Sequence, residues 1–115
     1  MGRSMPVSLP NGKSWPTKDK AYAYFQEILS RYVVGERVTE VEDHLDLVAL
    51  LTVYDAAVTE GEATKAGVGI DYFEKDVNDQ HLVKTKCFYV VRVDESRIDF
   101  SLRHAINAAA QRSTI

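Results

Sequence analysis

The chain has little of several residue types, and each shortage narrows what it can be. It has one cysteine, Cys87, and therefore no internal disulfide, so we expect a reducing, cytoplasmic setting. Its longest apolar run, Leu47–Leu51, is far too short to cross a bilayer. No apolar segment follows Arg3 to form a secretory signal. We therefore expect no membrane partner.

Histidine and cysteine, which commonly act as metal ligands or nucleophiles, are also few. The three histidines (His44, His81 and His104) have no metal-ligand spacing, so we predict no metal site. Cys87 is interpreted as a small buried hydrophobe rather than a nucleophile. Ser101 is not in the Gly-x-Ser-x-Gly elbow of acyl-transfer enzymes. We predict a protein without a cofactor or catalytic residues, and not an enzyme.

Charge is unevenly distributed along the 115 residues. The net charge is −3, but residues 1–35 and 81–115 each carry +3, whereas residues 36–62 carry −7. An acidic chain argues against non-specific nucleic-acid binding, although the two ends could form a basic patch. The acidic stretch Glu36–Asp46 is interpreted as a solvated surface and a helix start.

The length predicts one domain, residues 7–115, after a flexible tail at 1–6. Asn11-Gly12 predicts a short hairpin between Val7–Leu9 and Ser14–Trp15. A helix follows, capped by Thr17 and ended by Gly35, with an apolar stripe at helical spacing. The stripe residues are Ala21, Phe25, Ile28, Leu29 and Tyr32.

A second helix is predicted to begin at the cap Asp43 and to run through Tyr54, with a buried strand over Val48–Tyr54 as the alternative. From Gly67 the apolar period changes to two, which indicates a strand through Phe73, whereas Lys75–Gln80 is polar and loop-like.

The last third predicts a strand around Cys87–Arg92, a turn at Asp94-Glu95-Ser96, and a short strand Arg97–Phe100. Ser101 then caps a third helix, whose apolar stripe is Leu102, Ala105, Ile106 and Ala109. The expected fold class is α+β: a small antiparallel sheet with about three helices packed mainly on one face.

Four motifs in this order resemble the DCL (defective chloroplasts and leaves) family, a domain of unknown activity with bacterial members. They are Ile-Leu-x-x-Tyr ending at Tyr32, the pair Leu50-Leu51, Lys-x-Gly-x-Gly-Ile from Lys65, and the block Cys-Phe-x-x-x-Arg-x-Asp-x-Ser-x-x-Asp-Phe-Ser over 87–101. The similarity covers roughly residues 15–107.

The chain departs from the family pattern at three places. Val53-Tyr54-Asp55 stands where the family has His-Pro, Glu95 replaces the turn glycine, and His104-Ala105 replaces Lys-Cys. In plants, members are tied to ribosomal-RNA maturation in the chloroplast. The resemblance therefore implies an RNA-linked role by association, without a known reaction.

The candidate binding residues lie in the motif-rich second half. They are Lys65, Gly67, Gly69, Lys86, Arg92, Asp94, Asp99, Ser101 and Arg103.

Each group has a structural alternative. Lys65-x-Gly67-x-Gly69 could contact a phosphate, but glycines entering a strand more often permit a bulge or close backbone packing. Arg92 could contact an anion or pair with an acid across the strands. Asp94 could be a turn residue, and Ser101 a helix cap.

Lys84, Lys86, Phe88, Val90 and Arg92 share one face of their strand. Basic and aromatic groups together are typical of single-stranded RNA readers, but this face could equally pack beneath a helix.

The leading hypothesis is a non-enzymatic module associated with RNA or ribonucleoprotein. The alternatives are a protein-interaction adaptor that uses the acidic stretch and, less favoured, a small enzyme built on Arg92, Asp94 and Asp99.

Overall fold

The computed structural model describes residues 6–56, 64–78 and 85–113. Most of the predicted tail, together with His81 and Lys84, lies outside these residues. The elements are β1 (Val7–Ser8), β2 (Ser14–Trp15), α1 (Lys18–Ser30), α2 (Val41–Ala56), β3 (Ile70–Asn78), β4 (Thr85–Arg92), β5 (Arg97–Phe100) and α3 (Leu102–Ser113). The predicted α+β class is confirmed.

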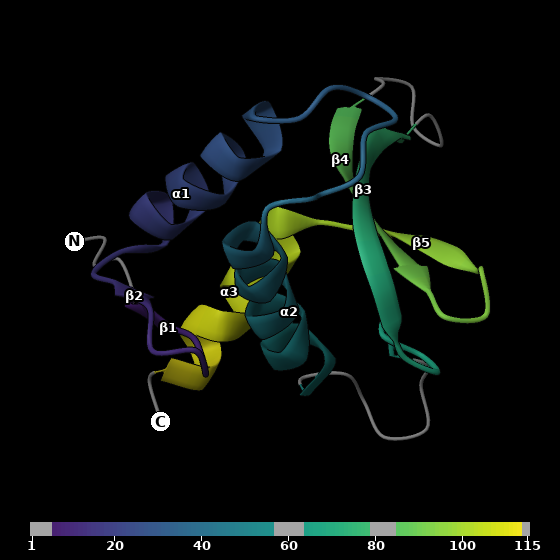
Figure 1. The fold of residues 1–115 in the computed structure, drawn as a ribbon. Coiled ribbons are helices and arrows are strands. Elements are labelled where there is room, and N and C mark those ends of the chain that lie inside the picture. Colours follow the sequence, from purple (N-terminus) through teal and green to yellow (C-terminus); the bar gives the residue numbers. More distant parts are fainter. Residues whose placement is uncertain (1–5, 57–63, 79–84, 114–115) are drawn as a thin grey trace.

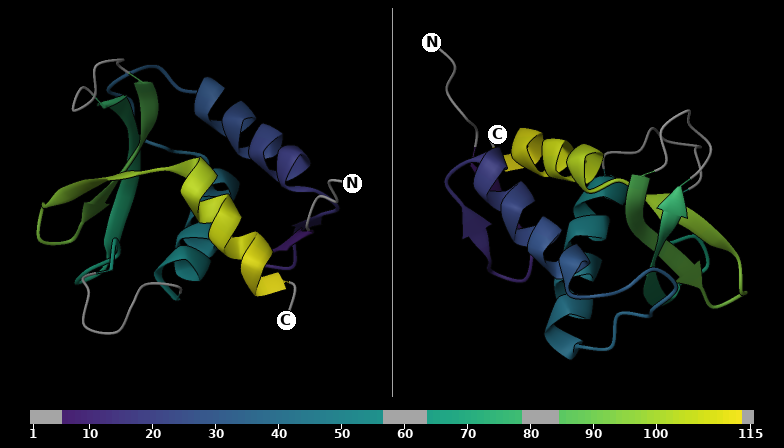
Figure 2. Two further views of the ribbon diagram at one scale, coloured as in Figure 1. Left: turned by 180° about the vertical axis from the view of Figure 1, so that it is seen from behind. Right: turned by 90° about the horizontal axis from the view of Figure 1, so that it is seen from above.

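The elements form a helical layer against one antiparallel sheet. β3, β4 and β5 are hydrogen-bonded in that order, and β1 pairs with β2 in a separate ribbon. Helices α1, α2 and α3 lie on one side of the three-stranded sheet, and none of the described residues forms a helix on its other side (Figures 1 and 2). In the central strand, Tyr89 is opposite Glu74 of β3 and Asp99 of β5.

Helix α1 starts as predicted but ends differently. Thr17 Oγ1 accepts a hydrogen bond from the Lys20 N–H at 3.1 Å, which satisfies a donor in the first turn. The helix ends at Ser30, and its C-cap residue Arg31 keeps a right-handed conformation. Gly35, predicted as the terminator, lies in the following loop with φ +92° and donates to Lys75 O at 2.7 Å.

Helix α2 is a helix and not the alternative strand, but it begins at Val41, two residues before the predicted cap. Asp43 lies in the first turn and is buried. It accepts hydrogen bonds from Arg31 Nη1 at 2.6 Å and Tyr32 Oη at 2.8 Å. Burial of a carboxylate requires such partners, and here they tie the end of α1 to the start of α2.

A second acid of the same stretch is also internal. Asp46 accepts hydrogen bonds from Asn11 Nδ2 and Lys13 Nζ, each at 2.9 Å, and from the Tyr24 hydroxyl. This contact fixes the β1–β2 turn against α1 and α2. The interpretation of Glu36–Asp46 as a solvated surface is therefore wrong for Asp43 and Asp46.

The polar segment predicted as a loop after Phe73 is strand as far as Asn78. Lys75 is only 7% exposed, and its Nζ donates to Leu29 O at 2.9 Å and Tyr32 O at 2.8 Å. These carbonyls lie at the end of α1, where backbone acceptors lack helical partners. A lysine can therefore face inward here because its charge meets two helix-terminal carbonyls.

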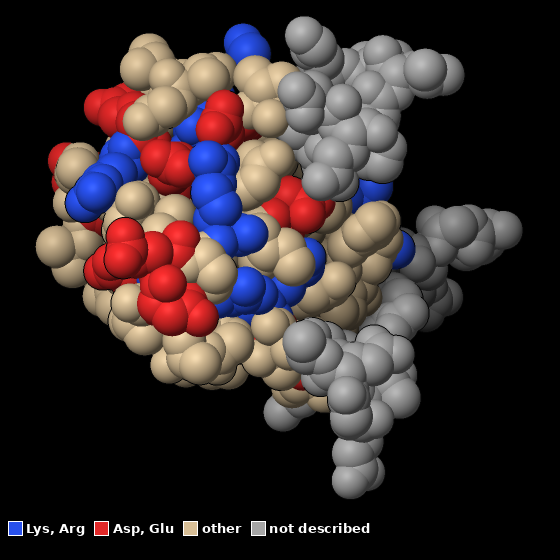
Figure 3. Space-filling model, turned by 90° about the vertical axis from the view of Figure 1, so that its right-hand side faces the viewer, with Lys and Arg blue, Asp and Glu red and all other residues tan. Residues whose placement is uncertain are grey.

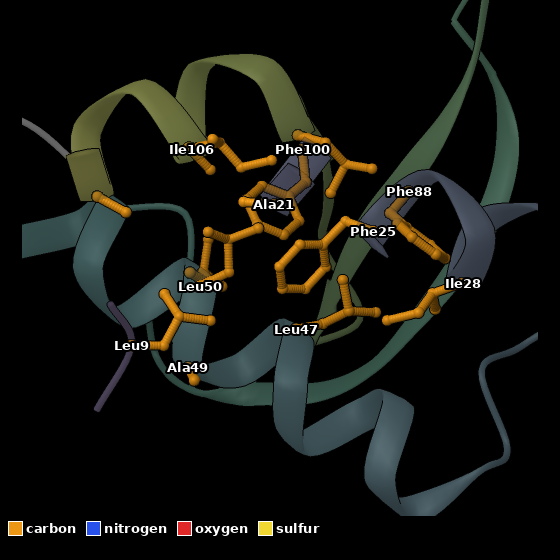
Figure 4. Close-up of a cluster of buried hydrophobic side chains, with 14 of the residues drawn as sticks. Leu9, Ala21, Phe25, Ile28, Leu47, Ala49, Leu50, Phe88, Phe100 and Ile106 are labelled. Atoms are coloured by element: carbon orange, nitrogen blue, oxygen red, sulfur yellow. The ribbon is translucent and has the colours of Figure 1, made fainter. Parts of the chain in front are cut away.

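The core lies between the helices and the inner face of the sheet. Its largest members are the fully buried phenylalanines Phe25, Phe73, Phe88 and Phe100. Side chains from α1, α2, α3 and the sheet converge on this cluster (Figure 4). The predicted stripe of α3 is buried, and Ser101 Oγ accepts from the His104 N–H at 3.3 Å, which confirms the predicted cap.

Candidate ligand-binding site

A pocket of about 310 Å³ opens between α1, the start of α3 and the first residues of β4. Both polar and apolar side chains line this pocket. The lining residues are Tyr22, Gln26, Leu29, Tyr54, Lys65, Lys86, Cys87, Asp99, Ser101, Leu102, Arg103 and His104. Five of the nine predicted site residues are among them: Lys65, Lys86, Asp99, Ser101 and Arg103.

Lysine 65 reaches the pocket from the loop before β3. Its Nζ donates to Asp99 O at 2.8 Å and lies 5.6 Å from the centre of the Tyr54 ring. The amine is thus held at the edge of β5 beside an aromatic face. These two contacts place the Lys65 amine at the pocket wall.

Arginine 103 comes from the first turn of α3. Its guanidinium lies 4.7 Å from the centre of the Tyr22 ring on α1, and the side chain is exposed. Lys86, at the start of β4, is exposed as well. The pocket therefore collects cations from three separate segments of the chain.

Cysteine 87 also lines the pocket, but its chemistry is suppressed. Burial raises the pKa of the Cys87 thiol from 9.0 to about 11, and the carboxylates of Asp99 and Asp76 add to the rise. The thiolate is the reactive form of cysteine. At neutral pH this residue is a protonated thiol, and it is half-buried rather than buried as interpreted from the sequence.

Several backbone N–H groups in the loop with the glycine motif are hydrogen-bonded within the chain. The N–H groups of Lys65 and Ala66 donate to the two carboxylate oxygens of Asp55, at 2.9 and 3.0 Å, and the Gly67 N–H donates to Thr64 Oγ1 at 3.1 Å. These three N–H groups already have acceptors within the chain. The contacts favour the structural alternative for this motif, and the phosphate interpretation stays a prediction.

The conformations of the two glycines fit the alternative interpretation, in which they permit a bulge or close backbone packing. Gly67 has φ +53° and Gly69 has φ +134°, and the Gly69 N–H donates to Ala66 O at 2.8 Å to close a turn. The ladder between β3 and β4 is irregular between Ile70 and Tyr72. A bulge at the strand entry was the structural prediction for this motif.

Arginine 92 holds this turn rather than a ligand. Its Nε donates to Lys65 O at 2.8 Å and its Nη2 to Thr64 O at 3.3 Å, while Nη1 reaches Ser96 Oγ at 3.3 Å. The predicted alternative, a cross-strand pair with an acid, is replaced by these contacts to carbonyls and a hydroxyl. Arg92 is thus adjacent to Lys65 but does not line the pocket.

Aspartate 94 is a turn residue, as its structural alternative predicted. Its Oδ1 accepts from the Ser96 N–H at 3.0 Å and from Ser96 Oγ at 2.5 Å, and these bonds lower the pKa of the Asp94 carboxyl. Asp94 and Arg92 are not among the pocket residues, so the grouping proposed for a small enzyme is not gathered there.

The strand face predicted to read RNA is covered. Phe88 and Val90 are fully buried beneath the helices, so bases cannot stack on them. The opposite face carries two tyrosines, each covered by an arginine: Arg37 lies 3.9 Å from the Tyr72 ring centre and Arg97 4.1 Å from that of Tyr89.

Charges on this outer side are largely paired. Arg97 Nη2 contacts Asp76 Oδ2 at 2.8 Å and Glu74 Oε1 at 3.4 Å. Figure 3 shows acidic and basic groups interleaved over this side of the molecule. Acids and bases thus alternate on this side, whereas the described lining of the pocket holds more cations than acids.

Other classes of site gain no support from the described part of the chain. Residues 6–56, 64–78 and 85–113 contain no group of three or more His, Cys, Asp or Glu side chains arranged to hold a metal ion. No helix in these ranges combines the length and apolar character that a bilayer crossing requires.

Comparison with protein families gives a match to the family described as "Protein of unknown function (DUF3223)", over residues 26–106. This range includes every pocket residue except Tyr22. The chain belongs to this family. The resemblance to the DCL family stays a prediction.

A solved structure supports the same fold for this DUF3223 domain. It is the solution NMR structure of an uncharacterized protein from Rhodospirillum rubrum, with a TM-score of 0.70, 28% sequence identity, and 91% of each chain covered. Comparison with curated proteins gives no match.

The helical side of the pocket was missed from the sequence. Tyr22, Gln26 and Tyr54 line it from α1 and α2. Helical spacing identifies which α1 residues face the core, but Tyr22 and Gln26 flank that stripe, and only the position of α3 decides that they border a cavity.

Proposed function

We propose that this domain is a non-catalytic module that binds RNA, alone or within a ribonucleoprotein, through the pocket between α1, α3 and β4. The observation that carries the proposal is the convergence of Lys65, Lys86 and Arg103 on one pocket in a chain of net charge −3. Lysine and arginine side chains that neutralise phosphates supply most of the affinity of such interfaces.

The surroundings of these cations suit a nucleotide. Arg103 presents a guanidinium plane above Tyr22, and guanidinium planes and aromatic rings both stack on unpaired bases. The Ser101 hydroxyl and the side chain of Gln26 add polar groups to the lining. The DCL resemblance, with its link to ribosomal-RNA maturation, supports the same ligand class.

Fluorescence anisotropy with labelled single-stranded and structured RNA at 50 and 200 mM salt tests the proposal. We expect salt-sensitive binding, and we expect Lys86→Ala and Arg103→Ala each to raise Kd by about fivefold to tenfold. Each should also lower the slope of log Kd against log salt by about 0.7, the value for one contact to a single strand.

Lys20→Ala is the matched control. Lys20 is an exposed lysine of α1 and is not among the pocket residues. Its removal should leave Kd and the salt slope unchanged. Wild-type protein that binds no RNA, or RNA binding insensitive to both pocket substitutions, contradicts the proposal.

One observation favours a second candidate, the protein-interaction adaptor. Glu36, Glu40 and Glu42 line an open pocket of about 650 Å³ between α1 and the start of α2. A basic partner segment would complement this pocket. Co-purification of a defined partner that is lost in Glu40→Lys/Glu42→Lys protein would support the adaptor. Asp43 is left intact because it is buried and holds α1 to α2.

A further inference from the structure

A second pocket lies beside the first along the same two helices, α1 and α3. A smaller pocket of about 200 Å³ is lined by Lys18, Asp19, Tyr22, Arg103, Ile106 and Asn107. Tyr22 and Arg103 line both pockets. The stacked Arg103–Tyr22 pair is therefore the divider between two compartments of one groove.

The order of residues gives the direction of this groove. Along α1 the lining runs from Lys18 in the small pocket to Leu29 in the large one, and along α3 from Asn107 back to Ser101. At a rise of 1.5 Å per residue, Lys18 to Leu29 spans about 16 Å. Phosphates in one strand of a duplex are spaced by about 3.4 Å along the axis. A groove of about 16 Å is therefore long enough for more than one phosphate, even when the strand is more extended than in a duplex.

Cations are present in both compartments. Lys18 contributes to the small pocket, Lys65 and Lys86 to the large one, and Arg103 to both. Two acids, Asp19 and Asp99, line the groove against these four bases. The excess of positive charge thus extends along the groove instead of concentrating at one point.

We infer that the ligand is an extended anionic chain: a single-stranded oligonucleotide that lies along the α1–α3 groove with phosphates in both compartments, and not a single nucleotide. Arg103 and Tyr22 contact it between the two phosphate positions. This inference rests on the proposed function and names the form of RNA that the site accepts.

A ladder of ligand lengths tests the inference on the full chain. Uridine monophosphate and oligouridylates of two, four and eight nucleotides are titrated into ¹⁵N-labelled protein, and Kd and backbone amide shifts are recorded. We expect Kd to fall at least tenfold between the mononucleotide and the tetranucleotide. The Ser101 and His104 amides should shift with both ligands, and those of Asp19 and Asn107 with the tetranucleotide alone.

Lys18→Ala separates the two compartments. It should raise Kd for the tetranucleotide by about fivefold and leave that of the mononucleotide unchanged, whereas Lys86→Ala should raise both. Lys20→Ala, two residues along the same helix, should change neither. Alanine is the best helix former, so these α1 variants keep the fold.

The outcomes distinguish this inference from the proposed function. A mononucleotide that binds as tightly as the tetranucleotide, or tetranucleotide binding unaffected by Lys18→Ala, overturns the groove while the RNA site stands. The absence of binding at every length overturns the proposed function itself, and the groove with it.

Discussion

A β-carbon on Gly67 would lie 3.0 Å from Nε of Arg92, the side chain that holds the turn before β3. Three hydrogen bonds fix this guanidinium, so it has little freedom to retreat. Gly67 also has φ +53°, in the left-handed region that L-residues disfavour. The glycine motif is thus explained by the close approach of an arginine to the backbone.

Gly67→Ala should therefore lower the free energy of unfolding by about 2 kcal/mol, of which about 1 kcal/mol is backbone strain and the rest the contact with Arg92. Urea denaturation measures the change. Gly12→Ala is the control for strain alone, because Gly12 has φ +91° and nothing within 4 Å of its would-be β-carbon. If Gly67→Ala costs no more with Arg92 present than in an Arg92→Ala background, the contact contributes nothing.

Glu95 is a residue with a side chain at a position where glycine would be favoured. It has φ +73° at the turn between β4 and β5, at the position where the DCL pattern has glycine. Glu95→Gly should raise the free energy of unfolding by about 0.5–1 kcal/mol, because relief of the left-handed strain exceeds the added entropy of the unfolded chain. Glu95→Gln keeps the β-carbon and should leave stability unchanged. An equal gain in both variants would assign the effect to charge rather than to backbone conformation.

Local signals in the sequence were sufficient for much of the fold. The Thr17 cap and the apolar stripe of α1 predicted that helix because both depend on residues within a few positions of one another. The Asn11-Gly12 turn and the Ser101 cap were predicted for the same reason. Each of these features is decided within a single element.

The failures came from contacts between distant segments. Lys75 appeared to belong to a loop because a lysine in a strand gives no apolar alternation, yet the carbonyls that accept its charge are more than forty residues away. Asp43 and Asp46 appeared solvated for the same reason, since their partners come from α1 and the first hairpin. The burial of an ionic group can therefore be predicted only when its partner in the fold is known.

The residues predicted for the candidate site also differ in how well the sequence predicted their role. Lys86 and Arg103 were predicted from their charge, and Lys65 from the charge that it adds to the glycine motif. The fold brings all three to one pocket. Gly67 and Arg92 were predicted from two separate motifs, and the structure packs Arg92 against the Gly67 turn. The Arg92 guanidinium is therefore engaged by the chain itself, whereas Lys65 lines the pocket.

The thiol of Cys87 should resist modification. Because burial and two nearby carboxylates raise its pKa to about 11, alkylation by iodoacetamide should stay slow at pH 9 and rise with an apparent pKa near 11. The folded pKa exceeds the unfolded value of 9.0, so this group stabilises the fold below pH 9, and its contribution is lost as pH rises through 11. Mass spectrometry of the alkylated fraction gives the profile.

Asp99→Asn is the matched variant for this measurement. Removing one of the two carboxylates that raise the pKa of Cys87 should shift the alkylation profile to lower pH and leave a residual elevation, because burial is the larger cause. A profile in the wild-type protein centred near 9.0, the unperturbed value of this thiol, would contradict the effect of burial on the pKa of Cys87.

Lys13 contacts two carboxylates in opposite surroundings, and this pair offers an internal comparison. Its Nζ lies 2.9 Å from Oδ2 of Asp46, whose side chain is 1% exposed, and 2.7 Å from Oε2 of Glu42, which is 76% exposed. Asp46→Asn should lower the free energy of unfolding by about 2 kcal/mol, because the buried site loses an acceptor that three donors share. Glu42→Gln should cost less than about 0.5 kcal/mol, because water replaces an exposed partner.

Urea denaturation of both variants at neutral pH measures this difference, and thermal denaturation should give the same order. Both variants keep the lysine, but Asp46 is buried and also accepts from Asn11 and Tyr24, whereas Glu42 is exposed. A larger loss for Asp46→Asn therefore measures the anchor between the first hairpin and α2 and not the Lys13 ion pair alone. Equal losses in the two variants would mean that Asp46 is solvated, and the first hairpin would then be free of α2.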